Sequence, residues 1–305
     1  MSKCYLCPRN CGAERDTGGR GFCGVPANPV VARAAPHFGE EPCISGEHGS
    51  GAVFFAGCTL RCVFCQNYGL SRAKQGVEIT VPRLREIFLE LRDQGVHNLN
   101  LVTGSHYVPQ IVQALEGLEL GIPVVWNSSG YEKAETLKML EGLVQVYLPD
   151  FKYLDNVLSL KYSAAPDYPE VATAAIKEMF RQTGKFRFDE DGMLQKGVLI
   201  RHLILPGQIE NSKNIIDWVS EHFEPDDVLF SLMSQYTPMG DLKNFPELKR
   251  RVSPAENDQV YEHLMESRIE NGFFQELEAA TTDMIPRFDG TGVTPSKNTD
   301  LHSKK

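Results

Sequence analysis

The chain has 305 residues, 42% of them hydrophobic and 23% charged, which is enough to bury a full hydrophobic core. Its formal net charge of -9 argues against nonspecific binding to nucleic acid. No stretch approaches the roughly 18 consecutive apolar residues of a membrane span, and the first residues, MSKCYLCPRN, lack the apolar core of a signal peptide. We therefore expect a cytoplasmic protein without a nucleic acid or membrane partner.

All eight cysteines lie within the first 65 residues, and residues 1–50 are rich in Cys, Gly and Pro without helical or strand periodicity. Thiols at short spacing in a chain without a secretory signal are more often metal ligands than disulfide partners. Residues 1–50 are therefore predicted to form a cysteine-rich metal-binding extension, with zinc or an iron-sulfur cluster on Cys4, Cys7, Cys11 and Cys23. Unmetallated thiols are the alternative. Cys43 is either a free thiol or an alternative fourth ligand.

From residue 51 the pattern changes to short apolar or β-branched runs that alternate with helical patterns. Six runs are predicted strands: 52–56, 99–102, 123–126, 144–148, 198–203 and 228–233. The clearest predicted helix begins at Pro82, a favoured first helical position, and ends at Gly95. The other predicted helices are 108–115, 133–140, 169–181, 212–222 and 254–269.

Strands that alternate with helices predict an α/β fold with a parallel sheet and right-handed crossovers. The sheet either curls into a full or partial barrel or stays open and doubly wound. In both arrangements ligands bind at the C-terminal ends of the strands. We assign residues 51–290 to this α/β domain, and residues 291–305, which are polar and basic, to a disordered tail.

A three-cysteine loop follows the first predicted strand directly, with Cys58, Cys62 and Cys65 in the pattern C-x3-C-x2-C. A four-iron cluster that receives only three thiolates keeps one iron open for a substrate, whereas electron-transfer clusters are usually closed by four. The spacing therefore indicates chemistry at iron, at the edge of the sheet where barrel sites are built. A three-cysteine zinc site or an inert iron-sulfur site is the alternative.

With Phe64 in the aromatic position, this loop resembles the signature loop of radical S-adenosylmethionine (SAM) enzymes. The resemblance implies a partial (β/α)6 barrel and a catalytic 4Fe-4S cluster on Cys58, Cys62 and Cys65. It also implies reductive cleavage of SAM to a 5'-deoxyadenosyl radical. The likeness is greatest to the glycyl-radical activating branch, above all to the pyruvate formate-lyase activating enzyme and its homologues with a cysteine-rich N-terminus. It spans roughly residues 51–240.

Turns after the second and third predicted strands carry part of the resemblance. The sequence Thr-Gly-Ser-His at 103–106 lies where the family has a Gly-Gly-Glu turn, so Gly104 and Ser105 are expected near the amino group of SAM. His106 replaces the acid and is either a turn residue or part of a site for a second substrate. Asn127 begins a stretch that resembles the family's Asp-Thr-Asn-Gly loop near the ribose, and its neutral amide attracts a cation less well than a carboxylate.

Later strands supply the remaining expected ligands of SAM. Asp150 and Lys152 match the family's Leu-Asp-Leu-Lys, with a solvated salt bridge as the alternative. Arg201 matches an arginine that pairs with the substrate carboxylate in the family. The planar guanidinium group of arginine suits a bidentate pair with a carboxylate. Gln235 either meets the adenine edge or caps the barrel. Because parallel strands end at one mouth, these residues predict one pocket.

The resemblance also implies partners. These are an electron donor such as flavodoxin or ferredoxin, and a glycyl radical enzyme whose glycine loses a hydrogen atom. One alternative is a radical SAM enzyme that acts on a small molecule. Another is a non-enzymatic iron-sulfur or zinc protein that serves as an electron carrier or a scaffold.

Overall fold

The computed structural model describes residues 3–275, 277 and 285–295. A largely parallel sheet organises the molecule, and each of the six predicted strands is present in it. These strands are β2 (Ser50–Phe55), β4 (Leu99–Val102), β5 (Val124–Ser128), β6 (Val146–Pro149), β8 (Leu194–Leu203) and β9 (Leu229–Met233). All neighbours in this set are parallel, so their C-terminal ends meet at one edge, as predicted.

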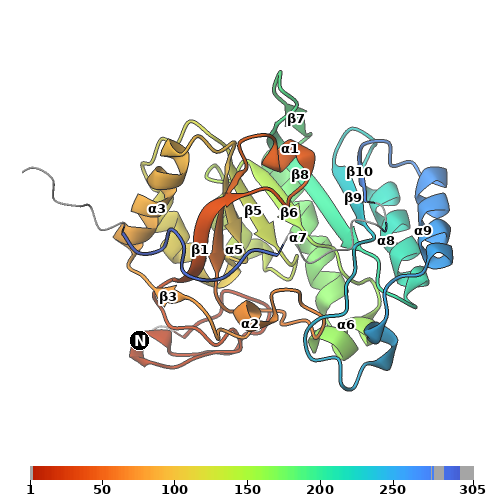
Figure 1. Ribbon diagram of the computed structural model, residues 1–305, viewed down its shortest axis with the longest axis horizontal. Helices are drawn as coiled ribbons and strands as arrows, with labels where there is room; N and C mark the ends of the chain where they lie inside the picture. Colours follow the sequence, from red (N-terminus) through yellow and green to blue (C-terminus); the bar gives the residue numbers. More distant parts are fainter. Residues whose placement is uncertain (1–2, 276, 278–284, 296–305) are drawn as a thin grey trace, which may run out of the picture.

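Four further strands extend the sheet: β1 (Val30–His37), β3 (Val77–Glu78), β7 (Arg187–Phe188) and β10 (Gly272–Phe274). The order is β10-β9-β8-β6-β5-β4-β2-β1-β3, and β7 pairs with β8 off this path. Among the described residues the two ends of the order do not pair with each other. The fold is therefore α/β with an unclosed, partial barrel (Figure 1).

Helices follow the parallel strands in alternation. Those predicted from the sequence are α3 (Val81–Asp93), α4 (Val108–Leu115), α5 (Ala134–Leu137) with η3 (Lys138–Leu140), α7 (Tyr168–Thr183), α8 (Ile209–His222) and α9 (Pro254–Glu266). The structure adds α1 (Pro42–Ser45), α2 (Tyr68–Ser71), α6 (Asn156–Ser163), η1 (Arg15–Thr17), η2 (Ser105–Tyr107) and η4 (Pro246–Lys249). In the described part of the chain, no helix is long and apolar enough to cross a membrane.

Helix α3 shows why a helix could be predicted from the sequence of this segment. The Thr80 side chain accepts a hydrogen bond from the backbone N–H of Arg83, and Pro82 occupies the first turn. The apolar side chains that recur at helical spacing are at most 1% exposed: Leu84, Ile87, Phe88 and Leu91. The helix therefore buries one continuous stripe against the core.

Strand β1 was not predicted, because residues 1–50 had been interpreted as lacking strand periodicity. It pairs antiparallel with β2, and its register shifts between Val31 and Arg33. This irregularity breaks the alternation of period two from which strands are recognised, and Pro36 obscures the pattern further. Residues 30–37 are thus hydrogen-bonded into the main sheet, although they lie inside the predicted extension.

The start of the predicted C-terminal tail also packs on β1. The backbone N–H of Ala34 donates to the carbonyl of Thr291 at 2.8 Å, and Val293 is fully buried. The blue C-terminal segment runs across β1 in Figure 1. Residues 291–295 are therefore ordered on the sheet, and residues 296–305 of the predicted tail lie outside the described residues.

Helix α1 closes the inner face of the partial barrel. Cys43 and Ile44 of this helix share an apolar cluster with strand residues Val125, Val146, Leu148, Leu199 and Leu229. Side chains two apart on a strand point to the same face. Asn127, Asp150 and Arg201 therefore lie on the same side as this cluster, nearer the C-terminal ends of their strands. The inner face consequently has an apolar floor and a polar upper layer.

Candidate functional site

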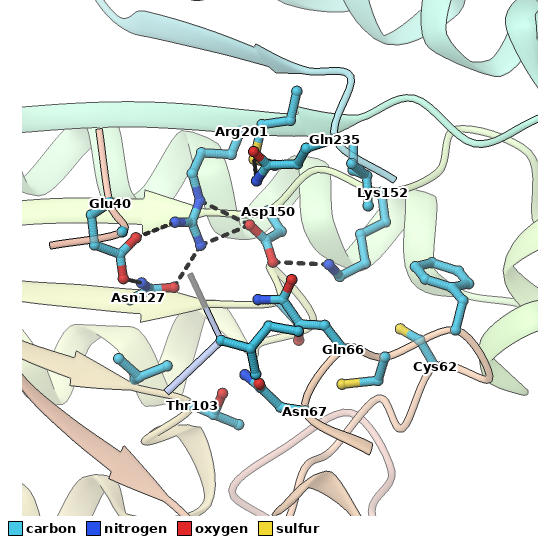
Figure 2. A pocket seen from close by; sticks show the side chains of 18 of the residues that line it. Glu40, Cys62, Gln66, Asn67, Thr103, Asn127, Asp150, Lys152, Arg201 and Gln235 are labelled. Carbon is cyan, nitrogen blue, oxygen red and sulfur yellow. Dashed lines mark hydrogen bonds and ion pairs between the residues drawn. The ribbon is translucent and has the colours of Figure 1, made fainter. Parts of the chain in front are cut away.

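A cavity of about 230 Å³ lies above this floor, where the parallel strands end. Its lining includes nearly all of the residues predicted for the cluster and for SAM: Cys58, Cys62, Phe64, Cys65, Asn127, Asp150, Lys152, Arg201 and Gln235. Figure 2 shows side chains from several strand ends converging on this one space. Of the residues predicted for the cluster and for SAM, Gly104 and Ser105 are outside the lining.

The cysteine loop begins with a glycine for a steric reason. Gly57 has φ +81°, and a Cβ at this position would lie 2.6 Å from the carbonyl oxygen of Cys23. The backbone N–H groups of Leu60 and Arg61 then donate to the Sγ of Cys58 at 3.3 and 3.5 Å. The loop is thus shaped around its first thiol and is packed against the N-terminal segment.

Two further contacts position the second and third thiols. Ser163 at the end of α6 donates to the Sγ of Cys62 at 3.1 Å. The ring of Phe64 packs edge-on against Tyr162 and Tyr236, with centroids 6.3 and 6.1 Å away. The aromatic position of the motif therefore anchors the loop in the core just before Cys65.

Burial raises the pKa of the Cys58 thiol, and it raises the pKa of Cys65 to about 12 with further contributions from the neighbouring thiols. At neutral pH both groups are protonated in the protein without a metal. Metal binding requires thiolates, so assembly of a cluster must release these protons.

Arg201 stands at the centre of a buried polar network (Figure 2). Its Nε donates to Asp150 Oδ1 at 2.9 Å, its Nη1 to Glu40 Oε2 at 2.7 Å and its Nη2 to Asn127 Oδ1 at 2.7 Å. Burial by itself would lower the pKa of Arg201, but Asp150 and Glu40 raise it above its usual value. Each nitrogen of the fork thus has an acceptor within the protein, whereas the sequence predicted a substrate carboxylate as its partner.

Lys152 extends the network toward the cysteines. Its Nζ donates to Asp150 Oδ2 at 2.8 Å, and the pair lines the cavity rather than the outer surface. Burial opposes the charge of Lys152, but the carboxylate of Asp150 raises the pKa of this ammonium above its usual value. Burial would also raise the pKa of Asp150, yet Arg201 and Lys152 hold it below its usual value. The cavity therefore contains a cation beside the thiols.

Two acidic residues of this site were missed by the sequence analysis. Glu40 and Glu41 follow β1 and line the cavity. Glu40 Oε1 accepts from Asn127 at 3.0 Å and from Asn100 at 3.2 Å. The Glu41 side chain is 3% exposed, and burial raises the pKa of its carboxyl against the opposing charge of Arg201, 3.9 Å away. Two adjacent acidic residues after an apolar run could have indicated a site at a strand end. They lie within residues 1–50, however, which the sequence assigns to the cysteine-rich extension.

The turn after β4 contributes Thr103 to the cavity, whereas the three residues that follow pack behind it. A Cβ on Gly104 would meet Ile111 at 2.8 Å, and Ser105 donates to Glu132 at 2.6 Å. His106 is buried and donates from Nε2 to the carbonyl of Ala56 at 2.8 Å. Burial lowers the pKa of His106 to about 3, so the ring is neutral. Of the two interpretations of His106, these contacts favour a turn residue.

Glu132 supports the cavity from behind and was also missed. This buried carboxylate accepts hydrogen bonds from Ser105 after β4, from Ser128 at the end of β5 and from the indole N–H of Trp126. Burial raises its pKa. By bonding to Ser105 and Ser128, Glu132 holds the turn that carries Thr103 against the end of β5, which carries Asn127. Its flanking sequence, Tyr-Glu-Lys, gives no indication of burial.

The N-terminal cysteines lie outside the cavity lining. Cys7 and Cys23 are buried, Cys4 is partly exposed and Cys11 is exposed. Across the described part of the chain, no group of three or more His, Cys, Asp or Glu side chains is placed to hold a metal ion, and this includes the three cavity cysteines. The second metal therefore stays a prediction. Cys43 is packed in the apolar floor, where burial raises the pKa of its thiol to about 12.

Comparison with known proteins identifies the family. The model of the radical SAM superfamily matches residues 52–219, more than half of the chain. The chain is also 30% identical over 274 residues to the uncharacterized protein MJ0674 of Methanocaldococcus jannaschii. The matched region covers 86% of this chain and 74% of that protein. This protein therefore belongs to the radical SAM superfamily.

Solved structures give weaker likenesses. Methylornithine synthase (PylB) has a TM-score of 0.49 at 14% identity, covering 90% of this chain and 79% of that one. SuiB of Streptococcus suis bound to its precursor peptide SuiA has a TM-score of 0.47 at 16% identity, covering 73% of this chain and 48% of that one. The structure of SuiB bound to S-adenosylmethionine has a TM-score of 0.46 at the same identity. This chain thus spans about half the length of SuiB.

Membership of the superfamily implies a 4Fe-4S cluster and SAM, and the types of residue that line the cavity suit both. Three thiols line it together, and Cys58 and Cys62 already accept hydrogen bonds of the kind that stabilise thiolates. Beside them, the buried Oδ1 of Asn67 has no hydrogen-bond partner among the described residues. Lys152 adds a cation next to the thiols. An iron-sulfur cluster and a polar ligand would satisfy these groups.

Proposed function

We propose that this protein reductively cleaves S-adenosylmethionine, with Cys58, Cys62 and Cys65 as the ligands of a 4Fe-4S cluster. One observation supports this proposal most strongly. The three cysteines of the loop share a cavity with Asp150 and Lys152, which come from a different strand end. A cluster bound here would supply one electron to the sulfonium group of SAM and leave a radical that abstracts a hydrogen atom.

The residues around the cluster position have distinct proposed roles. Lys152 uses one donor on Asp150 and keeps others for an anionic group such as the carboxylate of SAM. Arg201 orients Asp150 and Asn127 rather than binding this carboxylate itself. Gln235 offers an amide that suits the edge of a purine. Phe64, Leu203 and Met233 line the cavity with apolar surface, which limits the access of water.

The proposed hydrogen donor is a backbone glycine of a partner glycyl radical enzyme. This proposal is supported by the resemblance of the loop from Cys58 to Cys65 and of Asp150 and Lys152 to the activating branch. Reduction of the cluster then needs a one-electron donor such as flavodoxin or ferredoxin, and the cytoplasm is the compartment that suits such partners. A small-molecule substrate is the alternative.

The main test is anaerobic. The protein is reconstituted with iron and sulfide, reduced and mixed with SAM, and 5'-deoxyadenosine is measured. We expect product from the parent and from Cys43→Ala, which removes a buried thiol outside the cavity. Cys62→Ala is expected to give none. A well-formed cluster in the parent that yields no 5'-deoxyadenosine would contradict the proposal and favour an electron carrier or a scaffold.

The target is tested separately, by adding a candidate glycyl radical enzyme to the same mixture. A glycyl radical signal in the partner, with 5'-deoxyadenosine formed in equal amount, would support the activating role. Product that forms only with a small-molecule extract, and never with a partner protein, would contradict it.

We also propose a second metal on Cys4, Cys7, Cys11 and Cys23. The support for this proposal is the spacing of these cysteines in the sequence, Cys-x2-Cys-x3-Cys-x11-Cys, which offers four thiolates. The test uses a variant in which the three cavity cysteines are replaced by alanine, so that only the N-terminal set remains. About one zinc or about four irons per chain, lost in Cys7→Ser, would support the site and identify its metal. A metal-free protein would contradict it.

A further inference from the structure

A buried chain of hydroxyl groups ends on one of the three cavity thiols. The hydroxyl of Tyr153 lies 2.9 Å from the Oγ of Ser163, and this Oγ donates to the Sγ of Cys62 at 3.1 Å. The three residues are 0%, 3% and 6% exposed, so water does not compete for these bonds. Since the Ser163 proton is directed at sulfur, Tyr153 is the donor to Ser163.

Helix α6 presents this hydroxyl to the cysteine loop. Ser163 is its last residue, and Ala164 follows in a left-handed conformation with φ +49° that ends the helix. Beside it, the backbone N–H of Val63 donates to the carbonyl of Tyr162 at 2.9 Å. The end of α6 and the residue after Cys62 are therefore bonded through backbone and side chain together.

Arg9, from the cysteine-rich N-terminal segment, joins the same two elements. Its guanidinium donates to the carbonyls of Thr59 at 2.8 Å and Leu60 at 3.3 Å in the cysteine loop. It also donates to the carbonyl of Ser163 at 2.8 Å and to that of Ala164. These four backbone acceptors, two on each element, fix the distance between the loop and the end of α6.

Stacking fixes the guanidinium itself. The Arg9 group lies 3.9 Å from the centroid of the Phe22 ring and 5.1 Å from that of Tyr131. Phe22 immediately precedes Cys23, the last of the four N-terminal cysteines. Its ring therefore helps to hold Arg9, which lies between the second and third of them. The Arg9 side chain thus links the N-terminal segment to both the cysteine loop and the end of α6.

We propose that the Tyr153–Ser163 pair tunes the reduction potential of the cluster bound by Cys62, with Arg9 as the positioning residue. This inference rests on the proposed function, because it requires a cluster at the cavity. A hydrogen bond to a cysteinyl sulfur stabilises the more negative, reduced cluster and thereby raises its potential. The N-terminal segment then influences reduction of the cluster without entering the cavity.

The test is a redox titration of the reconstituted protein without SAM, followed by electron paramagnetic resonance. Ser163→Ala removes the bond to sulfur, and we expect a more negative midpoint potential than in the parent. Ser159→Ala is the matched control, because this buried serine lies on the same helix and bonds to the carbonyl of Asn156 instead of a thiol. Its potential is expected to equal that of the parent.

Two further variants keep the inference open to refutation if Ser163→Ala assembles poorly. Tyr153→Phe keeps the ring and removes the donor to Ser163, and a smaller shift in the same direction is expected. Arg9→Gln removes most of the carbonyl contacts, and it should shift the potential and broaden the cluster signal. Parent-like potentials in Ser163→Ala and Tyr153→Phe with intact clusters would overturn the inference.

These outcomes are separable from the main test. If the parent makes 5'-deoxyadenosine and the potentials do not move, only the tuning role is wrong. If the potentials move and the parent makes no 5'-deoxyadenosine, the tuning role stands and the cleavage proposal is wrong. A parent that binds no cluster at all would overturn both.

Discussion

At the residue scale, three acidic residues of the cavity share one arginine as an ionic partner. Arg201 is the common partner of Asp150 and Glu40, and it lies near Glu41 as well. Its side chain is 11% exposed, so these pairs are little screened by solvent. Removing one member of a buried ion pair leaves the other charge uncompensated, and this costs more than the pair itself contributes.

Arg201→Ala is therefore expected to lower the free energy of unfolding by about 3–5 kcal/mol. The control is Arg268→Ala, which removes an ion pair with Glu224 in which both side chains are largely exposed. That variant should lose less than about 1 kcal/mol. Urea unfolding measures both. Equal losses in the two variants would show that the network around Arg201 is not coupled to folding.

His202 gives a prediction on pH. It is fully buried between the carbonyl of Phe151 and the hydroxyl of Ser212, and burial lowers its pKa to about 4. A histidine whose folded pKa lies below the unfolded value of about 6.5 stabilises the fold fully above that value. This contribution is lost as the pH falls from the unfolded pKa toward the folded one.

The stability of the parent relative to His202→Gln should therefore decrease between pH 7.5 and pH 5, because glutamine does not titrate. Thermal unfolding of both proteins across this range provides the measurement. A difference that stays constant, or grows toward pH 5, would contradict the assignment of a neutral buried ring to His202.

At the element scale, β1 is the main departure from the sequence prediction. It contributes an interior strand between β2 and β3, and its continuation through Glu40 and Glu41 leads to α1, which forms the floor of the cavity. The residues of β2 are buried. Loss of β1 would leave the backbone groups on that edge of β2 without partners.

Truncation distinguishes the sheet part of the N-terminal region from its cysteine-rich part. Deletion of residues 1–50 removes β1, α1 and both glutamates, and we expect an aggregated product. Deletion of residues 1–28 leaves all of these in place, and we expect a folded, soluble protein. Size-exclusion chromatography and circular dichroism compare the two. A monomeric, folded product from the longer deletion would contradict this expectation and support the boundary at residue 50 that was predicted from composition.

At the scale of the whole molecule, convergence explains why a site could be predicted without coordinates. The cysteine loop follows β2, whereas Asn127, Asp150 and Arg201 come from β5, the end of β6 and β8. These segments are far apart in the sequence, but parallel strands bring their C-terminal ends together. Local periodicity was therefore sufficient to predict the strands and their common edge. The cysteine spacing and the family resemblance then gave several of the residues that line the cavity.

The sequence by itself determined the six parallel strands, most of the longer helices between them and the three-cysteine loop, because each has a local pattern in the chain. Only the tertiary structure decided what surrounds this loop. Glu40 meets Arg201 across 161 positions and Arg9 meets Ser163 across 154, and no periodicity links such pairs. The buried partners of Arg201, Glu132 and Cys62 are set by packing between elements, since burial of a charge or a thiol depends on neighbours that are distant in sequence.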